Sequence, residues 1–216
     1  MHPDWLSNAY LLADEEGGSA VFVDSGAPLE PLRSAVERWQ VEPAYVLRTH
    51  GHHDHVEHES ELGLPVRTDS LEVGELHVEA IPTPGHSDDM VAFVVNGDVV
   101  FSGDTLFKDA VGGGNLDQIR SSVMDVFMRL PHKTRVLPGH TDETTIGREW
   151  EENPFVRVWR GVEPEGTERV RVAGRDALLV VWSPDYDGNG KAWVRYDDGT
   201  DAIVGGSRVE RLDQAK

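Results

Sequence analysis

Short apolar runs ended by Gly, Pro or Asp recur along residues 1–161, and their lengths predict strands. Asn8–Asp14 and Ala20–Asp24 flank the turn sequence EEGGS and predict two paired strands. An Asn-Gly pair at 96–97 lies between two further runs and predicts a tight hairpin turn. The other predicted strands are Ala44–Thr49, Val78–Ile81, Met90–Val95, Asp98–Ser102 and Thr134–Leu137.

Apolar residues at helical spacing predict a first helix that begins at Pro31, a favoured first helical residue. Its apolar side is expected to be formed by Leu32, Val36 and Trp39. A helix at this point, between predicted strands, indicates a mixed α/β domain.

A second helix is predicted after Asn115, which can cap it in a capping-box pattern with Gln118. Its apolar residues share one face as far as Leu130. A third helix, Thr145–Glu152, is expected to end before Pro154, because the residue that precedes a proline disfavours helical geometry. Residues 1–161 are therefore predicted to form one α+β domain.

Helical patterns end near residues 161–166, and short strands separated by DYDGNG and DDGT turns follow. We interpret residues 167–216 as a small all-β module of the SH3 or Tudor type. Its predicted strands are Val170–Val172, Ala177–Trp182, Ala192–Tyr196 and Ala202–Val204. Its aromatic residues, Trp182, Tyr186, Trp193 and Tyr196, could form a surface patch. Core packing is the favoured interpretation, because a module this small needs its aromatic residues to bury area.

Charge and cysteine content narrow the range of functions. The chain has 39 Asp and Glu against 20 Lys and Arg, a net charge of −19. This charge repels nucleic acid phosphates and anionic lipid headgroups, so we expect a small-molecule substrate and neither nucleic acid nor membrane as a partner. There is no cysteine, which excludes disulfides, thiolate nucleophiles and cysteine metal sites. Without a secretory signal pattern or a long apolar run, a cytoplasmic protein is expected, of open oligomeric state.

One segment concentrates the chemistry. Residues 49–58, THGHHDHVEH, hold five histidines and one aspartate, whereas the other 206 residues hold five histidines. His50 and His52 lie two positions apart at the end of a predicted strand, so both imidazoles can reach one ion. Asp54 and His55 follow where the chain is expected to turn into a helix, and they should face a different point. The segment thus offers two half-sites of a two-metal centre.

Three further segments offer the missing ligands. His86 in PTPGHS, Asp104 in FSGDTLF and His140 in VLPGHT each follow a predicted strand or a glycine-flanked turn. Three histidines suit one zinc ion, an aspartate with two histidines suits another, and one carboxylate is left to bridge them. His53 is expected to point away from the metals. For His58, simple exposure is favoured over a place behind the ligands.

The H-x-H-x-D-H motif at residues 50–55, followed in order by G-H, G-D-T and P-G-H, resembles the metallo-β-lactamase-fold hydrolases. The stretches GDTLF and TTIGREWEENPF resemble the glyoxalase II branch in particular, and the resemblance covers roughly residues 5–160. It implies a four-layer αββα sandwich with two zinc ions at one edge, iron and manganese being alternatives. It places one metal on His50, His52 and His86, the other on Asp54, His55 and His140, and Asp104 between them.

The resemblance also implies a hydrolase in which a hydroxide shared by the two metals attacks a carbonyl, most simply that of a thioester. Asp54 is the expected catalytic residue, because it can orient the nucleophile and take its proton. Glyoxalase II enzymes usually carry a helical C-terminal extension, whereas a β module stands here, so the thiol carrier stays open, as do ester and lactone substrates.

Other functions stay open on the same fold. The first alternative is a persulfide dioxygenase that uses one iron. A nuclease is disfavoured, because residues 1–161 carry 12 basic against 28 acidic side chains. A docking role for the β module beside a vestigial metal site is the least favoured. The glycines at 112–114 could form a mobile lip over the substrate or a simple connection, with equal support.

Overall fold

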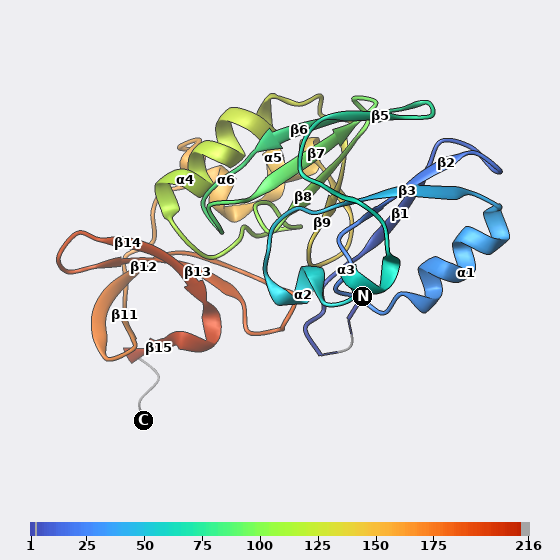
Figure 1. The fold of residues 1–216 in the computed structure, drawn as a ribbon. Coiled ribbons are helices and arrows are strands. Elements are labelled where there is room, and N and C mark those ends of the chain that lie inside the picture. The colour runs from blue at the N-terminus through green and yellow to red at the C-terminus, as the bar shows by residue number, and fades with distance from the viewer. Residues whose placement is uncertain (3, 213–216) are drawn as a thin grey trace.

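The computed structural model describes residues 1–2 and 4–212. Its main body contains two sheets, with helix α1 beyond one and helices α4, α5 and α6 beside the other (Figure 1). The first sheet has the order β1-β2-β3-β4 and consists of β1 (Tyr10–Ala13), β2 (Ser19–Val23), β3 (Glu42–Leu47) and β4 (Val66–Arg67). The second has the order β10-β9-β8-β7-β6-β5 and consists of β5 (Leu71–Val73), β6 (Leu76–Pro82), β7 (Val91–Val95), β8 (Val99–Gly103), β9 (Arg135–Pro138) and β10 (Thr144–Thr145).

Strand pairing follows the connections. Strands β1 and β2 pair antiparallel, as do β7 and β8, so both predicted strand pairs are confirmed. In the turn after β7, Asn96 and Gly97 have φ values of 51° and 72°, the left-handed geometry that a two-residue hairpin turn requires. The pairs β2–β3 and β8–β9 are parallel, and each needs a long crossover, which contains a helix in both cases.

Helix α1 (Glu30–Trp39) forms where it was predicted, with Pro31 in its first turn. Its apolar side differs from the prediction, because Ala35 is its buried residue and Trp39 is 39% exposed. The indole of Trp39 lines a surface hollow beside Leu11 and Ala13 of β1 and does not enter the core. The last turn of α1 therefore covers the edge of the sheet and not its face.

The predicted second helix is divided into α4 (Leu116–Ser121), a π-helical turn (Ser122–Val126) and a 3₁₀ turn (Phe127–Arg129). Its predicted apolar face is buried through Phe127. The side chain of Asn115 accepts a hydrogen bond from the Gln118 N–H at 3.1 Å, which confirms the cap. The Asn115 N–H donates to the Gly85 carbonyl at 2.9 Å, not to Gln118 as a capping box would have it.

The remaining helices are short: α2 (His53–Val56), α3 (Glu59–Leu62), α5 (Ile146–Glu152) and α6 (Pro154–Trp159). The predicted third helix is α5, and it ends before Pro154 as expected. The Asn153 side chain then caps α6 by accepting hydrogen bonds from the N–H groups of Phe155 and Val156. A residue that ends one helix thus begins the next.

Two apolar clusters hold the layers together. One lies between the sheets and joins Val23 and Leu47 of the first sheet to Phe93 and Phe101 of the second. The other lies on the opposite face of the second sheet, where β7 and β8 meet α4 and α6; its members include Ala92, Val100, Ile119, Val123, Phe127 and Phe155. With α1 beyond the first sheet, these contacts produce the four layers that the resemblance implies.

The C-terminal part forms a third, fully antiparallel sheet of order β14-β13-β12-β11-β15, which confirms the all-β prediction. Its strands are β11 (Glu168–Val172), β12 (Arg175–Ser183), β13 (Lys191–Tyr196), β14 (Asp201–Gly205) and β15 (Val209–Arg211). The SH3 or Tudor assignment and the domain limits at 161 and 167 stay predictions, and residues 213–216 lie outside the described part. Trp193 is buried as expected, whereas Trp182 is 38% exposed and does not belong to the core. Among the described residues, no helix has the length and apolar character that crossing a membrane requires.

Candidate metal centre

The structure gathers all seven predicted ligand side chains into three overlapping groups of potential ligand atoms. They come from four segments, each placed beyond the end of a strand. Residues 50–55 follow β3 and enter α2, and His86 follows β6. Asp104 directly follows β8, and His140 comes two residues after the end of β9. Strands of both sheets thus bring together side chains that lie far apart in the sequence.

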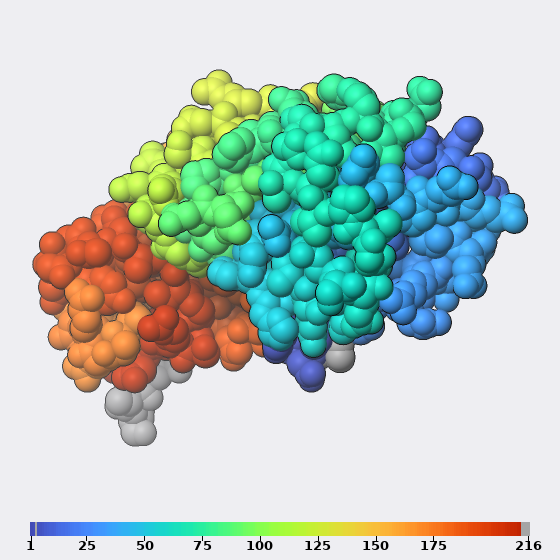
Figure 2. Space-filling view, in the orientation of Figure 1, coloured from blue at the N-terminus to red at the C-terminus, as the bar shows by residue number. Residues whose placement is uncertain are grey.

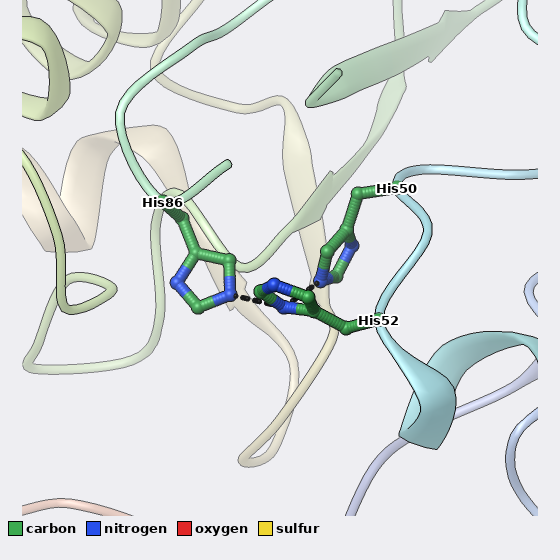
Figure 3. A group of neighbouring side chains, drawn as sticks. All are labelled: His50, His52 and His86. Carbon is green, nitrogen blue, oxygen red and sulfur yellow. Dashed lines mark hydrogen bonds between the residues drawn. The ribbon is translucent and has the colours of Figure 1, made fainter. Parts of the chain in front are cut away.

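The first set consists of His50, His52 and His86, whose ring nitrogens converge (Figure 3). The Nδ1 atom of His52 lies 3.0 Å from His50 Nε2 and 2.9 Å from His86 Nε2. His50 is buried, whereas His52 is exposed, so the set lies between the protein interior and solvent. Three imidazole nitrogens facing one point suit a zinc ion.

The second set consists of Asp54, His55 and His140. The Oδ2 atom of Asp54 lies 3.4 Å from His140 Nε2 and 3.6 Å from His55 Nε2. Both imidazoles are almost fully buried, and the Asp54 side chain is 25% exposed. Asp54 is therefore the part of this set that solvent can reach.

Asp104 lies between the two sets and faces both. Its Oδ1 is 3.3 Å from His55 Nε2, and its Oδ2 is 3.3 Å from His140 Nε2 and 3.6 Å from His86 Nε2. The carboxylate is nearly buried, with 7% of its side chain exposed. One carboxylate between two ligand sets has the position that a bridging ligand needs.

The chemistry of these atoms fits metal ions. His55 Nε2 and Asp104 Oδ1 are buried and have no hydrogen-bond partner among the described residues. Unpaired buried polar atoms are costly, at about 1–3 kcal/mol each, and a cation between them would satisfy both. Imidazole and carboxylate ligands suit zinc, iron or manganese.

Two glycines allow the segments to approach. A Cβ atom at Gly139 would lie 2.1 Å from Asp104 Oδ1, and one at Gly112 would lie 1.8 Å from the Asp104 carbonyl oxygen. Neither distance is possible for real atoms, so any side chain at these positions would push the segment away from Asp104. The glycine in the P-G-H motif is thus explained by its contact with the Asp104 carboxylate.

Comparisons with known proteins identify the family. The family model described as "Metallo-beta-lactamase superfamily" matches residues 61–140. An uncharacterized protein of Aquifex aeolicus is 31% identical over 193 residues, which span 68% of this chain and 90% of that protein. The chain belongs to the metallo-beta-lactamase superfamily. Metallo-hydrolases of the superfamily include the probable metallo-hydrolase YqgX of Bacillus subtilis, 27% identical over 69% of this chain and 92% of its own length.

Solved structures of the superfamily show the same fold. The BLEG-1 B3 metallo-beta-lactamase superposes with a TM-score of 0.65 at 27% identity, over 72% of this chain and 96% of its own. ETHE1 from Myxococcus xanthus superposes with a TM-score of 0.60 at 30% identity, over 70% of this chain and 80% of its own. TTHA1623, solved in a di-iron-bound form, superposes with a TM-score of 0.59 at 29% identity, over 72% of this chain and 98% of its own. The probable polyketide biosynthesis zinc-dependent hydrolase BaeB of Bacillus velezensis is 24% identical over 69% of this chain and 80% of its own. These names leave the metal of the present member open between zinc and iron.

A buried carboxylate, Asp24 at the end of β2, orients ligands of both sets. Its Oδ2 lies 2.9 Å from His55 Nδ1 and accepts the Thr49 hydroxyl at 2.8 Å, while its Oδ1 accepts the Thr49 N–H. Since the Thr49 hydroxyl donates to Asp24, it accepts from His50 Nδ1–H at 3.0 Å. This chain of contacts orients the rings of His50 and His55, so that both turn Nε2 towards the site.

The imidazoles of His86 and His140 are fixed by backbone carbonyls. His86 Nδ1 lies 3.0 Å from the Gly113 oxygen, and His140 Nδ1 lies 3.1 Å from the Leu6 oxygen. Both distances fit donation by Nδ1–H, which leaves Nε2 free to bind a metal. The glycine stretch at 112–114 therefore has a definite role in orienting His86. Gly114 also bridges to Ile203 of β14, which favours a packed connection over a mobile lip.

The first set is poor in positive charge. Burial lowers the pKa of His50 to about 4, and the neighbouring His55 adds to this effect. Burial also lowers the pKa of His86, although the charge of Asp104 opposes it. Both rings are neutral at pH 7 and can accept a metal ion without first losing a proton.

The second set is rich in negative charge. Burial works to lower the pKa of His55, but the carboxylates of Asp104, 3.3 Å from Nε2, and of Asp24, 2.9 Å from Nδ1, outweigh it and raise the pKa to about 11. For His140, hydrogen bonds to Asp104 and Asp54 overcome burial in the same way and raise the pKa to about 9. Carboxylates that favour protonated imidazoles also favour metal cations, which must displace those protons.

The stretch TTIGREWEENPF is held against the loop after GDTLF by a buried side chain, Glu149. Its Oε2 accepts hydrogen bonds from the Asp109 N–H and the Asn153 amide, both at 2.9 Å, and its Oε1 accepts the Thr144 hydroxyl at 2.6 Å. The Arg148 guanidinium binds Glu149 and Asp109, each at 2.7 Å. These contacts hold the loop after Asp104 against α5, which is a structural explanation for Thr144, Arg148, Glu149 and Asn153 of this stretch.

The structure adds residues that sequence reasoning missed. Asp24 and Leu6 orient ligands, and Tyr186 of the C-terminal sheet stacks on His140. Asp24 ends a predicted strand, which was the available signal; the other two had none. His53 is exposed beside Trp5, with ring centroids 4.8 Å apart, and His58 pairs with Glu61. Neither belongs to the three groups of ligand atoms, as expected.

Proposed function

We propose that this member of the superfamily is a hydrolase that holds two divalent metal ions, most simply zinc, and cleaves thioesters. The observation that carries the proposal is the Asp104 carboxylate, which faces both ligand sets within 3.6 Å. A carboxylate shared between two ligand sets suits two ions, whereas a single non-haem iron would use the same carboxylate with only two histidines.

Each metal ion has its own residues. His50, His52 and His86 would hold one, and Asp54, His55 and His140 the other, with Asp104 shared. When bound, two such ions supply Lewis acidity and lower the pKa of water towards neutrality. The chain itself supplies the oriented imidazoles and the accessible carboxylate.

Asp54 is the proposed catalytic residue. Burial would raise the pKa of its carboxyl group, but a hydrogen bond to His140 outweighs it and lowers the pKa, so Asp54 is ionised at neutral pH. Its partial exposure lets it hold an attacking water by one hydrogen bond and take up the proton that water releases. The almost fully buried Asp104 has no comparable access to solvent.

The site suits a substrate whose leaving group needs no proton. A thiol has a pKa near 8.5, so a thiolate leaves at neutral pH more readily than an alkoxide or an amide anion. The stretches GDTLF and TTIGREWEENPF, which resemble glyoxalase II, support the same choice. The net charge of −19 supports a small molecule over a nucleic acid as the substrate.

A substrate screen tests the proposal. Purified protein would be loaded with zinc and tested with thioesters of several thiols, with oxygen esters and with lactones, and with Asp104→Ala as the inactive control. We expect release of free thiol from at least one thioester, at a rate that Asp104→Ala abolishes. Hydrolysis of esters or lactones alone would contradict the thioester assignment, and activity equal in Asp104→Ala would contradict the site.

The second candidate is a persulfide dioxygenase that uses one iron, with which the similarity to ETHE1 is compatible. Metal analysis and oxygen uptake with a thiol persulfide separate the two candidates. One iron per chain with oxygen consumption would replace the hydrolase proposal, whereas two metals without oxygen consumption would eliminate the dioxygenase.

A further inference from the structure

The C-terminal sheet is joined to the main body through a common apolar core. Val180, Val181, Trp193 and Ile203 of this sheet belong to the same cluster as Ile119, Val123, Phe155 and Trp159 of the main body. A backbone bridge between Gly114 and Ile203 adds a polar link beside the loop that orients His86. In Figure 2 the two parts lie in direct contact. The position of the sheet relative to the metal centre is therefore fixed by packing.

The loop between β12 and β13, residues 184–190, extends from this sheet to the metal centre. A buried ion pair anchors it: Lys191 Nζ lies 2.9 Å from Asp185 Oδ2, with 10% and 2% of their side chains exposed. Nζ is also 5.7 Å from the centre of the Tyr186 ring and 6.0 Å from that of Phe107. A buried, paired lysine is rare, and here it holds the loop at the point where it meets the main body.

Tyr186 meets the metal centre directly. Its ring stacks on the imidazole of His140, with centroids 4.0 Å apart and planes 9° apart. The Phe107 ring meets both edge-on, at 5.7 Å from His140 and 6.0 Å from Tyr186. With the Leu6 carbonyl at Nδ1, the imidazole of His140 is held at its face and at its edge.

A pocket of about 310 Å³ adjoins this contact. The β module contributes Pro184, Asp185 and Tyr186 to its lining, and the main body contributes Lys108 and Thr141 among others. Thr141 directly follows His140, so the pocket begins next to a proposed metal ligand. A volume of this size accommodates a small organic molecule.

We infer that the β module is a working part of this metal centre: Tyr186 is a positioning residue that fixes the imidazole of His140, and it forms one wall of the substrate pocket. The inference rests on the proposed function, because it gives His140 a metal to hold. The relatives named above cover 68–69% of this chain.

The test compares three replacements of Tyr186 in the zinc-loaded full chain. Tyr186→Ala removes the ring, Tyr186→Leu keeps bulk without an aromatic face, and Tyr186→Phe keeps the stack without the hydroxyl. Tyr196→Ala is the matched control, because Tyr196 lies on β13 beside Arg175. The primary measurement is the rate at which a chelator removes each zinc ion, and the secondary one is the split between kcat and KM.

We expect Ala and Leu to accelerate the loss of one zinc ion by about two- to tenfold, which corresponds to the strength of one aromatic pair. The KM should rise in the same variants, and Phe should restore metal release to the wild-type rate. Zinc release at the wild-type rate in both the Ala and the Leu variant would overturn the inference. Zinc release from the Phe variant as fast as from the Ala variant would overturn it too. If the Tyr186→Ala protein does not fold, the rate of zinc release from Tyr186→Leu decides the outcome.

Failure of the proposed function looks different. Wild-type protein that binds two zinc ions but hydrolyses no thioester would overturn the thioester assignment, while the release rates would still decide the role of Tyr186. Normal thioester turnover with unchanged zinc release in every Tyr186 variant would overturn the role of Tyr186 and leave the thioester assignment standing.

Discussion

The two ligand sets lie within a few ångströms of each other, yet the pKa values of their buried histidines shift in opposite directions. Burial lowers the pKa of His50 in the first set to about 4, so its nitrogen is free at neutral pH. In the second set the carboxylates overcome burial and raise the pKa of His55 to about 11 and that of His140 to about 9. The fate of a buried imidazole thus depends on whether carboxylates accompany it. The first set is ready for a metal, and the second must exchange protons for one.

The largest expected effect comes from removing the carboxylate that both sets share. Asp104→Ala should abolish turnover and loosen at least one metal ion by more than about 100-fold, because changes behind the ligands alone cost about 10–100-fold. Metal content after gel filtration and thioester turnover are the measurements. Asp98→Ala, on the exposed turn before β8, is the control and should leave both unchanged. Full metal content in Asp104→Ala would show that the sets do not depend on it.

Removing one ligand from each set should separate the two ions. His52→Ala and His140→Ala should each reduce the zinc content from two ions to one, with a loss of affinity of about 100-fold at the altered set. Spectra of the cobalt-substituted variants would show which set is still occupied. His58→Ala, which loses a surface contact with Glu61, should bind two ions. If both ligand variants lost the same ion, the division into two sets would be wrong.

Replacing residues that orient the ligand histidines should have smaller effects, each mainly on one ligand set. Asp24→Asn weakens the partner of His55 and should lower the affinity of the second set by about 10–100-fold. Thr49→Val breaks the link to His50 and should act mainly on the first set. Zinc titrations of both variants check this contrast. Equal losses at both sets in either variant would mean that Asp24 acts by holding the fold, not by orienting single ligands.

The last prediction is the response of the metal affinity to pH. A proton on His140 or His55 competes with the metal, so the affinity of the second set should rise as the pH is raised from neutrality towards 9. The gain is at most about tenfold per pH unit for each proton displaced. The first set should change little in this range, because the pKa of His50 is about 4. Isothermal titration at several pH values, in buffers of different ionisation enthalpy, would measure the protons released.

Much of this centre could be predicted because its ligands follow strands. A strand end fixes where the next residue points, so His86, Asp104 and His140 were identified from short motifs and the fold brings them together. The wrong details come from longer-range packing. Trp39 has the spacing of a buried helical residue but is 39% exposed and lies beside β1, at the edge of the first sheet.

What could not be predicted depends on contacts between distant segments. Nothing in the local sequence around Tyr186 indicates that its ring meets His140, since the contact requires the packing of a whole sheet on α4 and α6. Leu6 acts through a backbone carbonyl, which any residue type provides. Asp24 could be noticed as a polar residue at the end of a predicted strand. Its partner Thr49 follows a different strand, so their contact could not be predicted from the local sequence.

The central claim is that seven side chains from four segments hold two metal ions. The most direct measurement is the number of zinc ions bound per chain when chelator-stripped, tag-free protein is titrated and observed by native mass spectrometry. The account predicts two ions per chain at saturation. Saturation at one ion, or no binding at all, would contradict it.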